Sequence, residues 1–344
     1  MPIYSTKSDI RTLYILYLSL RLAHTLFCPA CYSENVPNSS LKGIVPALVT
    51  PFREDERIDY GAWQVLIDAQ IAAGVDGVFA GGSQGEFFSL DMEERQVAMR
   101  FCRQATAGRV TLYGNVGCVT TRDTVKLARQ AEEMGIDVVV AVTPWYLKPS
   151  PQELVDHYVE VCRAVRLPVM AYNFPLHGGV DLQPETLGRI AAQCENLVGV
   201  KDSGGNLEQS VAYRTCAPGR ELAVFLGPDP LILTGLRRGC AGALTGCINV
   251  APKLFVDLYA AIREGRSAEA ERLQALVNEL GAAHALHTFP SIMKEAMRMA
   301  GLPAGVCRRP VGPVPEPARR TLAALVDRLH AEGYLSKPPQ AVTA

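Results

Sequence analysis

The chain of 344 residues carries 34 lysines and arginines against 35 aspartates and glutamates, and 48% of its residues are hydrophobic. Global disorder needs low hydrophobicity and high net charge, and nucleic-acid binding is usually accompanied by a basic surplus, so this composition argues against both classes. The length allows one large α/β domain or two medium-sized ones around a sizeable core.

Residues 1–41 differ from the rest of the chain. Leu13–Leu20 is a short apolar run flanked by Arg11 and Arg21, well below the ~18–20 apolar residues that a membrane helix requires. No small-residue cleavage site of a secretory signal follows the run. We therefore expect a poorly ordered extension and no membrane association.

Ten cysteines in 344 residues are too few for a disulfide scaffold. Cys28 and Cys31 have C-x-x-C spacing, but they lack the second pair or the histidines that a zinc site would need. The other eight are scattered without framework spacing. This usage predicts free thiols, no metal site and a location in the reducing cytoplasm.

From residue 42 onward, short β-rich runs alternate with longer amphipathic segments. The predicted strands are Gly43–Val49, Gly77–Ala80, Val110–Asn115, Val138–Val142, Pro168–Tyr172, Leu197–Lys201, Ala223–Gly227 and Ala241–Leu244. The helices predicted between and after them are Tyr60–Ala73, one capped by Ser89, Thr121–Met134, Gln152–Arg163, Pro184–Cys194, Leu207–Arg214, Pro230–Arg238 and Pro252–Glu264. Helical spacing of apolar residues and glycine or capping residues at the ends support these assignments.

Eight β/α units within residues 42–266 match the usual size of a (β/α)8 TIM barrel. The alternation implies parallel strands and right-handed crossovers; a doubly wound sheet is the alternative, but it rarely contains eight such regular units. Beyond Arg266 the pattern is purely helical. We expect a small C-terminal helical appendage over residues 267–334 and a tail over 335–344, with helices at Ala268–Leu286, Ser291–Ala300 and Glu316–His330.

Barrel enzymes carry their catalytic groups at the C-terminal ends of the strands. After the second predicted strand comes Gly81–Glu86, in which Gly82, Ser83 and Gln84 lie together. Glycines let backbone N–H groups approach and cradle a carboxylate, and Ser83 adds a hydroxyl. The segment lacks the G-x-G-x-x-G dinucleotide pattern, and a plain glycine turn is the alternative.

Tyr172 and Lys201 end two further predicted strands. The phenol of Tyr172 would project into the barrel mouth and relay protons, unless the ring is only a packed aromatic. Desolvation of Lys201 would lower its pKa, and a neutral amine attacks carbonyls to form a Schiff base. The alternatives for Lys201 are a snorkelling lysine or a buried ion pair with Asp202 or Glu86.

Taken together and in this order, these groups resemble the dihydrodipicolinate synthase / N-acetylneuraminate lyase family of pyruvate-dependent class I aldolases and lyases. The resemblance runs from about Gly43 to Val314. The segments that carry it are Thr50-Pro51-Phe52, Gly81–Glu86, Val116-Gly117-Cys118, Thr143-Pro144-Trp145-Tyr146, Tyr172–Pro175, Gly199–Ser203 and Cys307–Pro313.

The resemblance implies a role for each of these residues. Lys201 would form the imine with pyruvate or another 2-oxo acid, Tyr172 would shuttle protons, and Ser83 with the N–H groups of Ser83 and Gln84 would hold the carboxylate. Tyr146 resembles the tyrosine that family members contribute to a neighbouring subunit's site, which implies a homo-oligomer, commonly a dimer of dimers. The implied partners are a 2-oxo acid and an aldehyde, with no metal or organic cofactor.

Departures from the family patterns leave the substrate open. His177 stands where synthase members carry an arginine for the second substrate's carboxylate; it could bind an acid or simply line the loop. Asp229 matches the first acid of the Asp-Glu pair of sialate lyases, but Pro230 replaces the second, and Gly246 replaces their serine.

Gln84 replaces the usual second hydroxyl residue of the glycine loop. It resembles the amide of the 4-hydroxy-2-oxoglutarate aldolase branch, which shares the sequence Lys201–Gly205. A hydroxyl relay from Tyr172 cannot pass through an amide in the same way. Ser203 is a candidate contact for the distal part of the substrate.

The sequence thus predicts a Schiff-base lyase or aldolase acting on a 2-oxo acid, with pyruvate as product or substrate. A dehydratase of a 2-keto-3-deoxy sugar acid, working through the same imine, is the second enzyme hypothesis. A non-catalytic 2-oxo acid sensor is the alternative from another class; Lys201 and Tyr172 argue against it, because reversible binding requires neither.

Overall fold

A computed structural model describes residues 41–335 of the chain. The interpretations of Leu13–Leu20 and of the Cys28–Cys31 pair lie outside the described residues, as does that of the last nine residues. Within the described part, no helix is both long and apolar enough to cross a membrane. All eight cysteines of this part are free thiols, whereas the cytoplasmic location stays a prediction.

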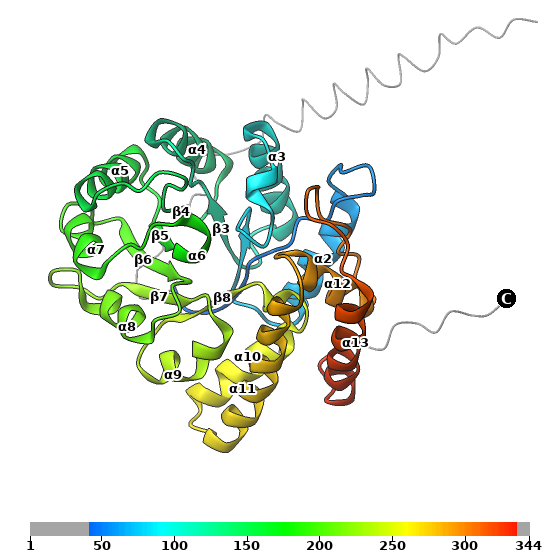
Figure 1. The fold of residues 1–344 in the computed structure, drawn as a ribbon. Coiled ribbons are helices and arrows are strands. Elements are labelled where there is room, and N and C mark those ends of the chain that lie inside the picture. The colour runs from blue at the N-terminus through cyan, green and yellow to red at the C-terminus, as the bar shows by residue number, and fades with distance from the viewer. Residues whose placement is uncertain (1–40, 336–344) are drawn as a thin grey trace, which may run out of the picture. The chain divides into compact units, whose positions relative to one another are not determined.

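Eight parallel strands form a barrel (Figure 1). They are β1 (Gly43–Pro46), β2 (Gly77–Ala80), β3 (Thr111–Asn115), β4 (Val138–Val142), β5 (Val169–Asn173), β6 (Leu197–Asp202), β7 (Ala223–Leu226) and β8 (Gly242–Thr245). Each strand from β2 to β7 pairs with the next, and β1 pairs with β8 through Gly43 and Gly242. A parallel bridge between Ala47 and Phe79 joins the β1 side to β2. The predicted (β/α)8 fold is therefore confirmed.

Helices alternate with the strands and surround them (Figure 1). They are α2 (Tyr60–Ala72), α3 (Met92–Thr106), α4 (Thr121–Met134), α5 (Pro151–Ala164), α6 (Pro175–Gly178), α7 (Pro184–Ala191), α8 (Leu207–Thr215), α9 (Ile232–Arg237) and α10 (Pro252–Arg263). The short α6 was not predicted. It spans only four residues directly after β5, too few to show an apolar period.

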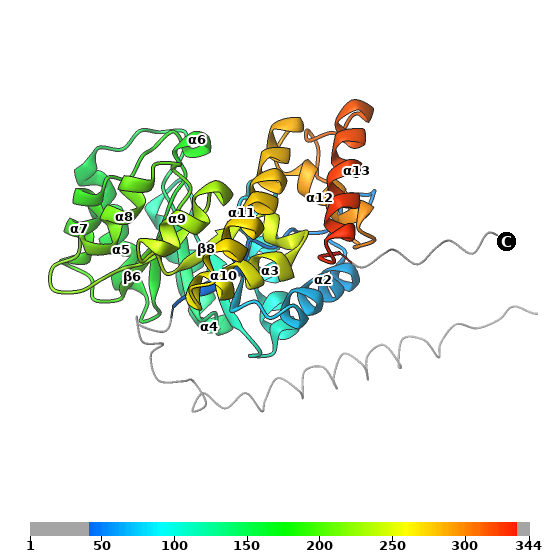
Figure 2. The same cartoon turned by 90° about the horizontal axis from the view of Figure 1, so that it is seen from below.

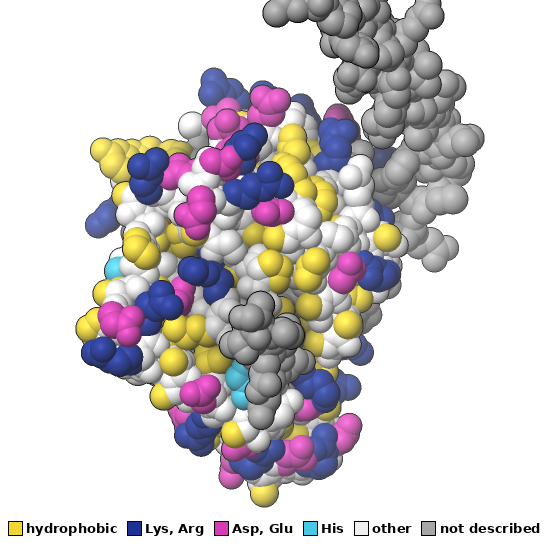
Figure 3. Space-filling view, turned by 90° about the vertical axis from the view of Figure 1, so that its right-hand side faces the viewer, with side chains coloured by type: hydrophobic (Ala, Val, Ile, Leu, Met, Phe, Trp, Pro, Cys, Tyr) yellow, Lys and Arg dark blue, Asp and Glu magenta, His cyan; other side chains and the backbone are white. Residues whose placement is uncertain are grey.

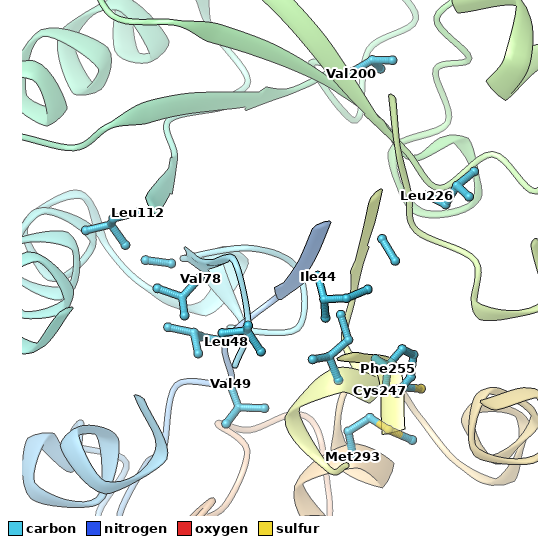
Figure 4. Close-up of a cluster of buried hydrophobic side chains, with 14 of the residues drawn as sticks. Ile44, Leu48, Val49, Val78, Leu112, Val200, Leu226, Cys247, Phe255 and Met293 are labelled. Atoms are coloured by element: carbon cyan, nitrogen blue, oxygen red, sulfur yellow. The ribbon is translucent and has the colours of Figure 1, made fainter. Parts of the chain in front are cut away.

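Neighbouring residues of a strand point to opposite sides of the barrel wall. Ile44 of β1 belongs to the large core between strands and helices, and Val45 belongs to the smaller core inside the barrel, as the period of two requires. Figure 4 shows the outer core, with Ile44, Val78 and Val200 from three different strands. Both clusters consist of apolar side chains, so we look for the polar residues of a functional site at the ends of the strands.

The predicted C-terminal helical appendage is also present. It comprises α11 (Ser267–Ala282), α12 (Ser291–Met299) and α13 (Glu316–Ala331). Helix α11 packs against α10, and α13 packs against α12; Figure 2 shows the four helices together on one side of the barrel. The boundary proposed at residue 266 stays a prediction.

Several local predictions were wrong. The first strand ends at Pro46 and not at Val49, and α7 ends at Ala191 and not at Cys194. Ser89 does not cap α3: it closes a 3₁₀ turn, and Asp91 is the cap. Asp91 Oδ1 accepts from Glu94 N at 2.8 Å, while Asp91 N donates to Glu94 Oε2 at 3.1 Å. This reciprocal pair satisfies two free N–H groups of the helix end, which a serine two residues earlier cannot do. The helix predicted over Ala268–Leu286 ends at Ala282 and continues as a 3₁₀ turn.

Basic and acidic side chains are mixed on the face of the molecule that Figure 3 presents. Many charged residues of the described part form ion pairs, such as Arg309–Glu56 and Arg328–Glu279. On this face the described residues form no basic stripe of the kind that nucleic acid binding uses.

Candidate active site

A cavity of about 440 Å³ opens where β5, β6 and β8 end. Its lining residues are Ala47, Ser83, Gln84, Tyr172, Phe174, Leu176, His177, Lys201, Ser203, Gly227, Pro228, Asp229, Pro230, Leu244, Thr245, Gly246, Gly281, His284 and Phe289. Seven predicted site residues are among them. Two are not: Gly82 lies in the adjoining loop, and Tyr146 lies elsewhere on the barrel. The location agrees with the rule for barrel enzymes.

Lys201 lies inside this cavity with only 4% of its surface exposed. The register of β5 and β6 pairs it with Tyr172, and its Nζ lies 4.0 Å from the centroid of the Tyr172 ring and 5.0 Å from that of Phe79. Burial lowers the pKa of Lys201 to about 7. A substantial fraction of the amine is therefore neutral near pH 7, the form that attacks a carbonyl.

The two non-catalytic alternatives for Lys201, a snorkelling side chain and a buried ion pair, are both wrong. The side chain does not snorkel, since it is buried. No carboxylate of residues 41–335 pairs with it: the Asp202 carboxylate accepts from Asn173, Gly204 and Ser210, and Glu86 pairs with Lys294. An amine kept out of water without a counter-ion is a typical catalytic environment.

Tyr172 places its hydroxyl oxygen 3.3 Å from Ser83 Oγ. Its ring is packed edge-on against Phe79 and stacked on Phe174, so it is both a packed aromatic and a cavity residue. Burial raises the pKa of Tyr172 to about 12, although hydrogen bonds with Ser83 and Ser203 oppose the rise. The phenol therefore holds its proton at neutral pH and can donate it.

The glycine loop presents unused donors. Among the described residues, the backbone N–H groups of Ser83 and Gln84 donate to no protein acceptor. A side chain at Gly85 would place its Cβ 2.7 Å from Leu48 O, and one at Gly82 would meet the Phe79 ring at 2.6 Å. The glycines are thus required by close packing, and the free N–H groups suit a carboxylate.

A buried ion pair between Glu86 and Lys294 anchors the end of this loop. The pair was not predicted from the sequence. The side chain of Glu86, in a left-handed backbone conformation at φ 56°, accepts from Lys294 Nζ and, at 3.0 Å, from Arg308 N. Lys294 also donates to Val306 O at 2.6 Å and lies over the Phe52 ring. The only sequence signal was a lysine within the apolar face of the helix predicted over Ser291–Ala300.

Gln84 and Gly246 fit one another. Gln84 Nε2 donates to Pro290 O at 3.1 Å, and a Cβ at Gly246 would lie 2.5 Å from Gln84 Oε1. The two departures noted in the sequence therefore form one local arrangement, in which the glycine leaves room for the larger amide.

His177 lies on α6 at the cavity wall, where its ring packs between Phe174 and Phe289. Burial lowers its pKa below the usual 6.5. The imidazole is therefore predominantly neutral at neutral pH and supplies no fixed positive charge. Among the residues that line the cavity, Lys201 is the one lysine or arginine.

Asp229, Cys247 and His284 form a cluster that the sequence did not reveal, because the three are spread over 56 residues. Each offers an atom within 4.8 Å of the others. Thr245 Oγ1 donates to Asp229 Oδ1 at 2.8 Å, and Cys247 Sγ lies 3.4 Å from His284 Nε2. These residue types can ligate zinc, but burial and the Asp229 carboxylate raise the pKa of the Cys247 thiol, which opposes the thiolate form.

Tyr146 stands apart from the cavity. It is 93% exposed, and its backbone has a φ of 73°. A non-glycine residue in this left-handed region is uncommon and costs roughly 1–3 kcal/mol. The conformation holds the ring out into solvent.

Comparison with known proteins extends over most of the chain. The model of the dihydrodipicolinate synthetase family matches residues 40–329. The chain is 38% identical to the Escherichia coli K12 protein named probable 2-dehydro-3-deoxy-D-pentonate aldolase YjhH, over 85% of this chain and 98% of that protein. It is 35% identical to the 4-hydroxy-tetrahydrodipicolinate synthase of Chelativorans sp. strain BNC1, over 78% of this chain and 92% of that protein.

A solved structure agrees with these matches. YagE, a prophage protein of the dihydrodipicolinic acid synthase family from Escherichia coli K12 whose crystal structure holds pyruvate, superposes with a TM-score of 0.81. The identity is 32%, and the superposition covers 84% of this chain and 98% of YagE.

Proposed function

The chain belongs to the dihydrodipicolinate synthetase family, and from this premise we propose that it is a lyase or aldolase that forms a Schiff base between Lys201 and a 2-oxo acid. The observation that carries the proposal is the buried Lys201 amine, which has no counter-ion and lies against the Tyr172 ring. The pyruvate held by its relative YagE supports pyruvate as the 2-oxo acid.

The chemistry follows from the two side chains. The neutral Lys201 amine attacks the keto carbon, and Tyr172 gives its proton to the hydroxyl of the carbinolamine, which leaves as water. The resulting iminium withdraws electrons, so the Tyr172 phenolate can remove a proton from the pyruvate methyl group to give an enamine. The enamine attacks an aldehyde carbon, the new alkoxide takes the proton back from Tyr172, and hydrolysis frees Lys201. Read in reverse, the same steps cleave the carbon–carbon bond.

The glycine loop completes the pyruvate site in this proposal. The free N–H groups of Ser83 and Gln84 would bind the carboxylate next to the keto carbon. The Ser83 hydroxyl, 3.3 Å from that of Tyr172, would carry protons between Tyr172 and the bound acid.

Borohydride reduction tests the imine directly. Incubation with pyruvate and borohydride is expected to add one reduced pyruvyl group to the protein, and peptide mass spectrometry should locate it at Lys201. Lys201→Ala should give no adduct, whereas Tyr172→Phe should still give one, about 10²-fold more slowly, because it lacks only the proton donor. An adduct on another lysine, or one that survives Lys201→Ala, would contradict the proposal.

Tyr146 supports an oligomer. Its strained backbone and exposed ring suit a side chain that completes the site of a neighbouring copy, so we propose a homo-oligomer that buries it. Analytical ultracentrifugation is expected to show an assembly larger than a monomer. Tyr146→Ala should lower kcat, and a fully active monomer would refute this part of the proposal.

A further inference from the structure

We propose that Asp229, Cys247 and His284 bind one zinc ion on the wall of the cavity that holds Lys201, and that the bound ion slows turnover by filling part of this space. Zinc binding does not depend on the proposed function. The effect on turnover rests on it, because it concerns the reaction at Lys201.

The three side chains come from three separate 3₁₀ turns. Asp229 begins the turn after β7, Cys247 begins the turn after β8, and His284 lies in the turn Ala283–Leu286 after α11. One ligand atom of each lies within 4.8 Å of the others. The spacing of the cysteines argued against a metal site, but spacing carries no signal when the ligands meet from distant turns.

The separations between the ligand atoms suit tetrahedral zinc. Zinc binds thiolate sulfur at about 2.3 Å and imidazole nitrogen at about 2.0 Å, so a sulfur and a nitrogen that share the ion lie about 3.5 Å apart. Cys247 Sγ lies 3.4 Å from His284 Nε2, and the Cys247 thiol is hydrogen-bonded to the Asp229 carboxylate. An ion can therefore take the place of the thiol proton without a large movement of the three side chains.

Neighbouring residues hold the Asp229 carboxylate in place. Thr245 Oγ1 donates to Asp229 Oδ1 at 2.8 Å, the kind of outer hydrogen bond that orients a ligating carboxylate. Gln274 of α11 donates to Asp229 O at 2.9 Å. A Cβ at Gly281 would lie 3.0 Å from Asp229 Cβ, so this glycine lets the end of α11, which leads to His284, approach the carboxylate. The ligands are thus positioned before an ion arrives.

The buried charge of Asp229 lacks a cation. The residue is only 5% exposed, and no lysine or arginine of residues 41–335 forms an ion pair with it. Lys201, the one lysine or arginine of the cavity lining, attacks a carbonyl in its neutral form. A dication bound by one carboxylate and one thiolate leaves no net charge in this desolvated space, which removes the cost of an unpaired buried carboxylate.

The donor set favours zinc over the common hard cations. Calcium and magnesium prefer shells of oxygen ligands, whereas thiolate, imidazole and carboxylate together suit zinc. When zinc binds, the S–H bond of Cys247 breaks and its proton leaves to the solvent. The thiolate and the neutral His284 nitrogen then donate electron pairs to the ion.

The fourth position of the ion faces the cavity. Asp229 and His284 line the cavity of about 440 Å³, whereas Cys247 lies behind them and does not. Three protein ligands leave a tetrahedral zinc ion one open position for water or for part of a substrate. The ion and this fourth ligand occupy space that the reaction at Lys201 would use.

The zinc content of the full chain tests the site. After removal of metals with a chelator and dialysis against zinc, the protein is expected to hold one zinc ion per protomer. Cys247→Ser and His284→Phe should each lose this ion, and Thr245→Val should weaken its affinity by about 10-fold or more. Cys216→Ser, at a half-buried thiol whose hydrogen bond to Tyr213 O a serine can also make, is the matched control and should keep the zinc.

Cobalt reports on the ligands directly. Co²⁺ added to the metal-free protein is expected to occupy the same site and to give a thiolate-to-cobalt charge-transfer band in the near ultraviolet. Cys247→Ser should abolish this band. The double variant Cys28→Ser/Cys31→Ser, which removes the C-x-x-C pair, should keep both the band and the zinc. Denaturant unfolding of each variant shows that it is folded, so that the loss of metal identifies a ligand.

Three outcomes would overturn zinc binding: metal-free protein that takes up no stoichiometric zinc, zinc that Cys247→Ser and His284→Phe both retain, or zinc that is lost only with the Cys28 and Cys31 pair. Zinc-loaded protein should lose most of its turnover of pyruvate with an aldehyde, and a chelator should restore it; an unchanged rate would refute the effect on turnover. Borohydride trapping on the metal-free protein separates the two proposals, because its failure refutes the proposed function and leaves zinc binding standing.

Discussion

Replacement of Lys201 by methionine is expected to abolish turnover and, at the same time, to stabilise the fold. Burial lowers the pKa of this lysine from 10.5 to about 7. At about 1.4 kcal/mol per pKa unit, the buried amine costs of the order of 5 kcal/mol in unfolding free energy when it has to be charged. Methionine fills a similar volume without that cost and cannot form an imine.

The gain in unfolding free energy from Lys201→Met depends on pH. Below pH 7 the amine is protonated in the folded and the unfolded chain, so the full cost is present. Between pH 7 and 10.5 the folded chain holds a neutral amine while the unfolded chain still binds the proton, so the cost shrinks as the pH rises. Above pH 10.5 it is absent. The advantage of Lys201→Met should therefore be large at pH 6.5 and small at pH 9.5.

Denaturant unfolding of the two proteins at both pH values measures this difference. Lys253→Met, at a surface position, is the control and should change stability by no more than about 0.5 kcal/mol. If Lys201→Met proves less stable than the unmodified protein at pH 6.5, or if its gain in stability does not depend on pH, the amine is not desolvated as argued.

The same desolvation of Lys201 predicts that the rate of imine formation rises with pH until about pH 7 and then stays constant.

The barrel could be predicted because its determinants are local. Gly77–Ala80, Thr121–Met134 and Val138–Val142 have the predicted bounds, since apolar runs, capping residues and glycine stops fix them within a few residues. Lys201 and Tyr172 were found by the same means: each was predicted to end a strand and lies one residue before the end of β6 or β5, and the barrel rule brings strand ends together.

The rest of the site depends on contacts between distant segments. Glu86 and Lys294 are 208 residues apart, and neither has a neighbour in sequence that indicates the other. Cys247 and His284 likewise meet only because the 3₁₀ turn after β8 and the one after α11 bring them within 3.4 Å of one another. Hydrophobic period and capping carry no information about such pairs, so the sequence left Glu86 open as an alternative partner of Lys201, whereas the structure pairs it with Lys294.

Lys294→Met is expected to destabilise the protein by about 3–5 kcal/mol, since it leaves the buried Glu86 carboxylate without its cation. Both side chains of the pair are almost entirely buried, at 3% and 0% exposure. Glu86→Gln in the Lys294→Met background should recover most of the loss, because the amide needs no counter-ion. Denaturant unfolding of the two single variants and the double variant measures the coupling.

Activity separates a structural role from a positioning role for this pair. Glu86 lies three residues after Ser83, and Thr50 Oγ1 donates to Gly85 O at 2.7 Å between them, so the pair fixes the loop that would hold the pyruvate carboxylate. In the double variant, whose stability is restored, KM for pyruvate should rise about 10-fold while kcat changes less. Arg298→Met, which removes a half-exposed partner of Glu295, is the control and should leave both constants unchanged. An unaltered KM in the double variant would mean that α12 only stabilises the barrel, whereas the expected rise would show that α12 positions the loop of the pyruvate site.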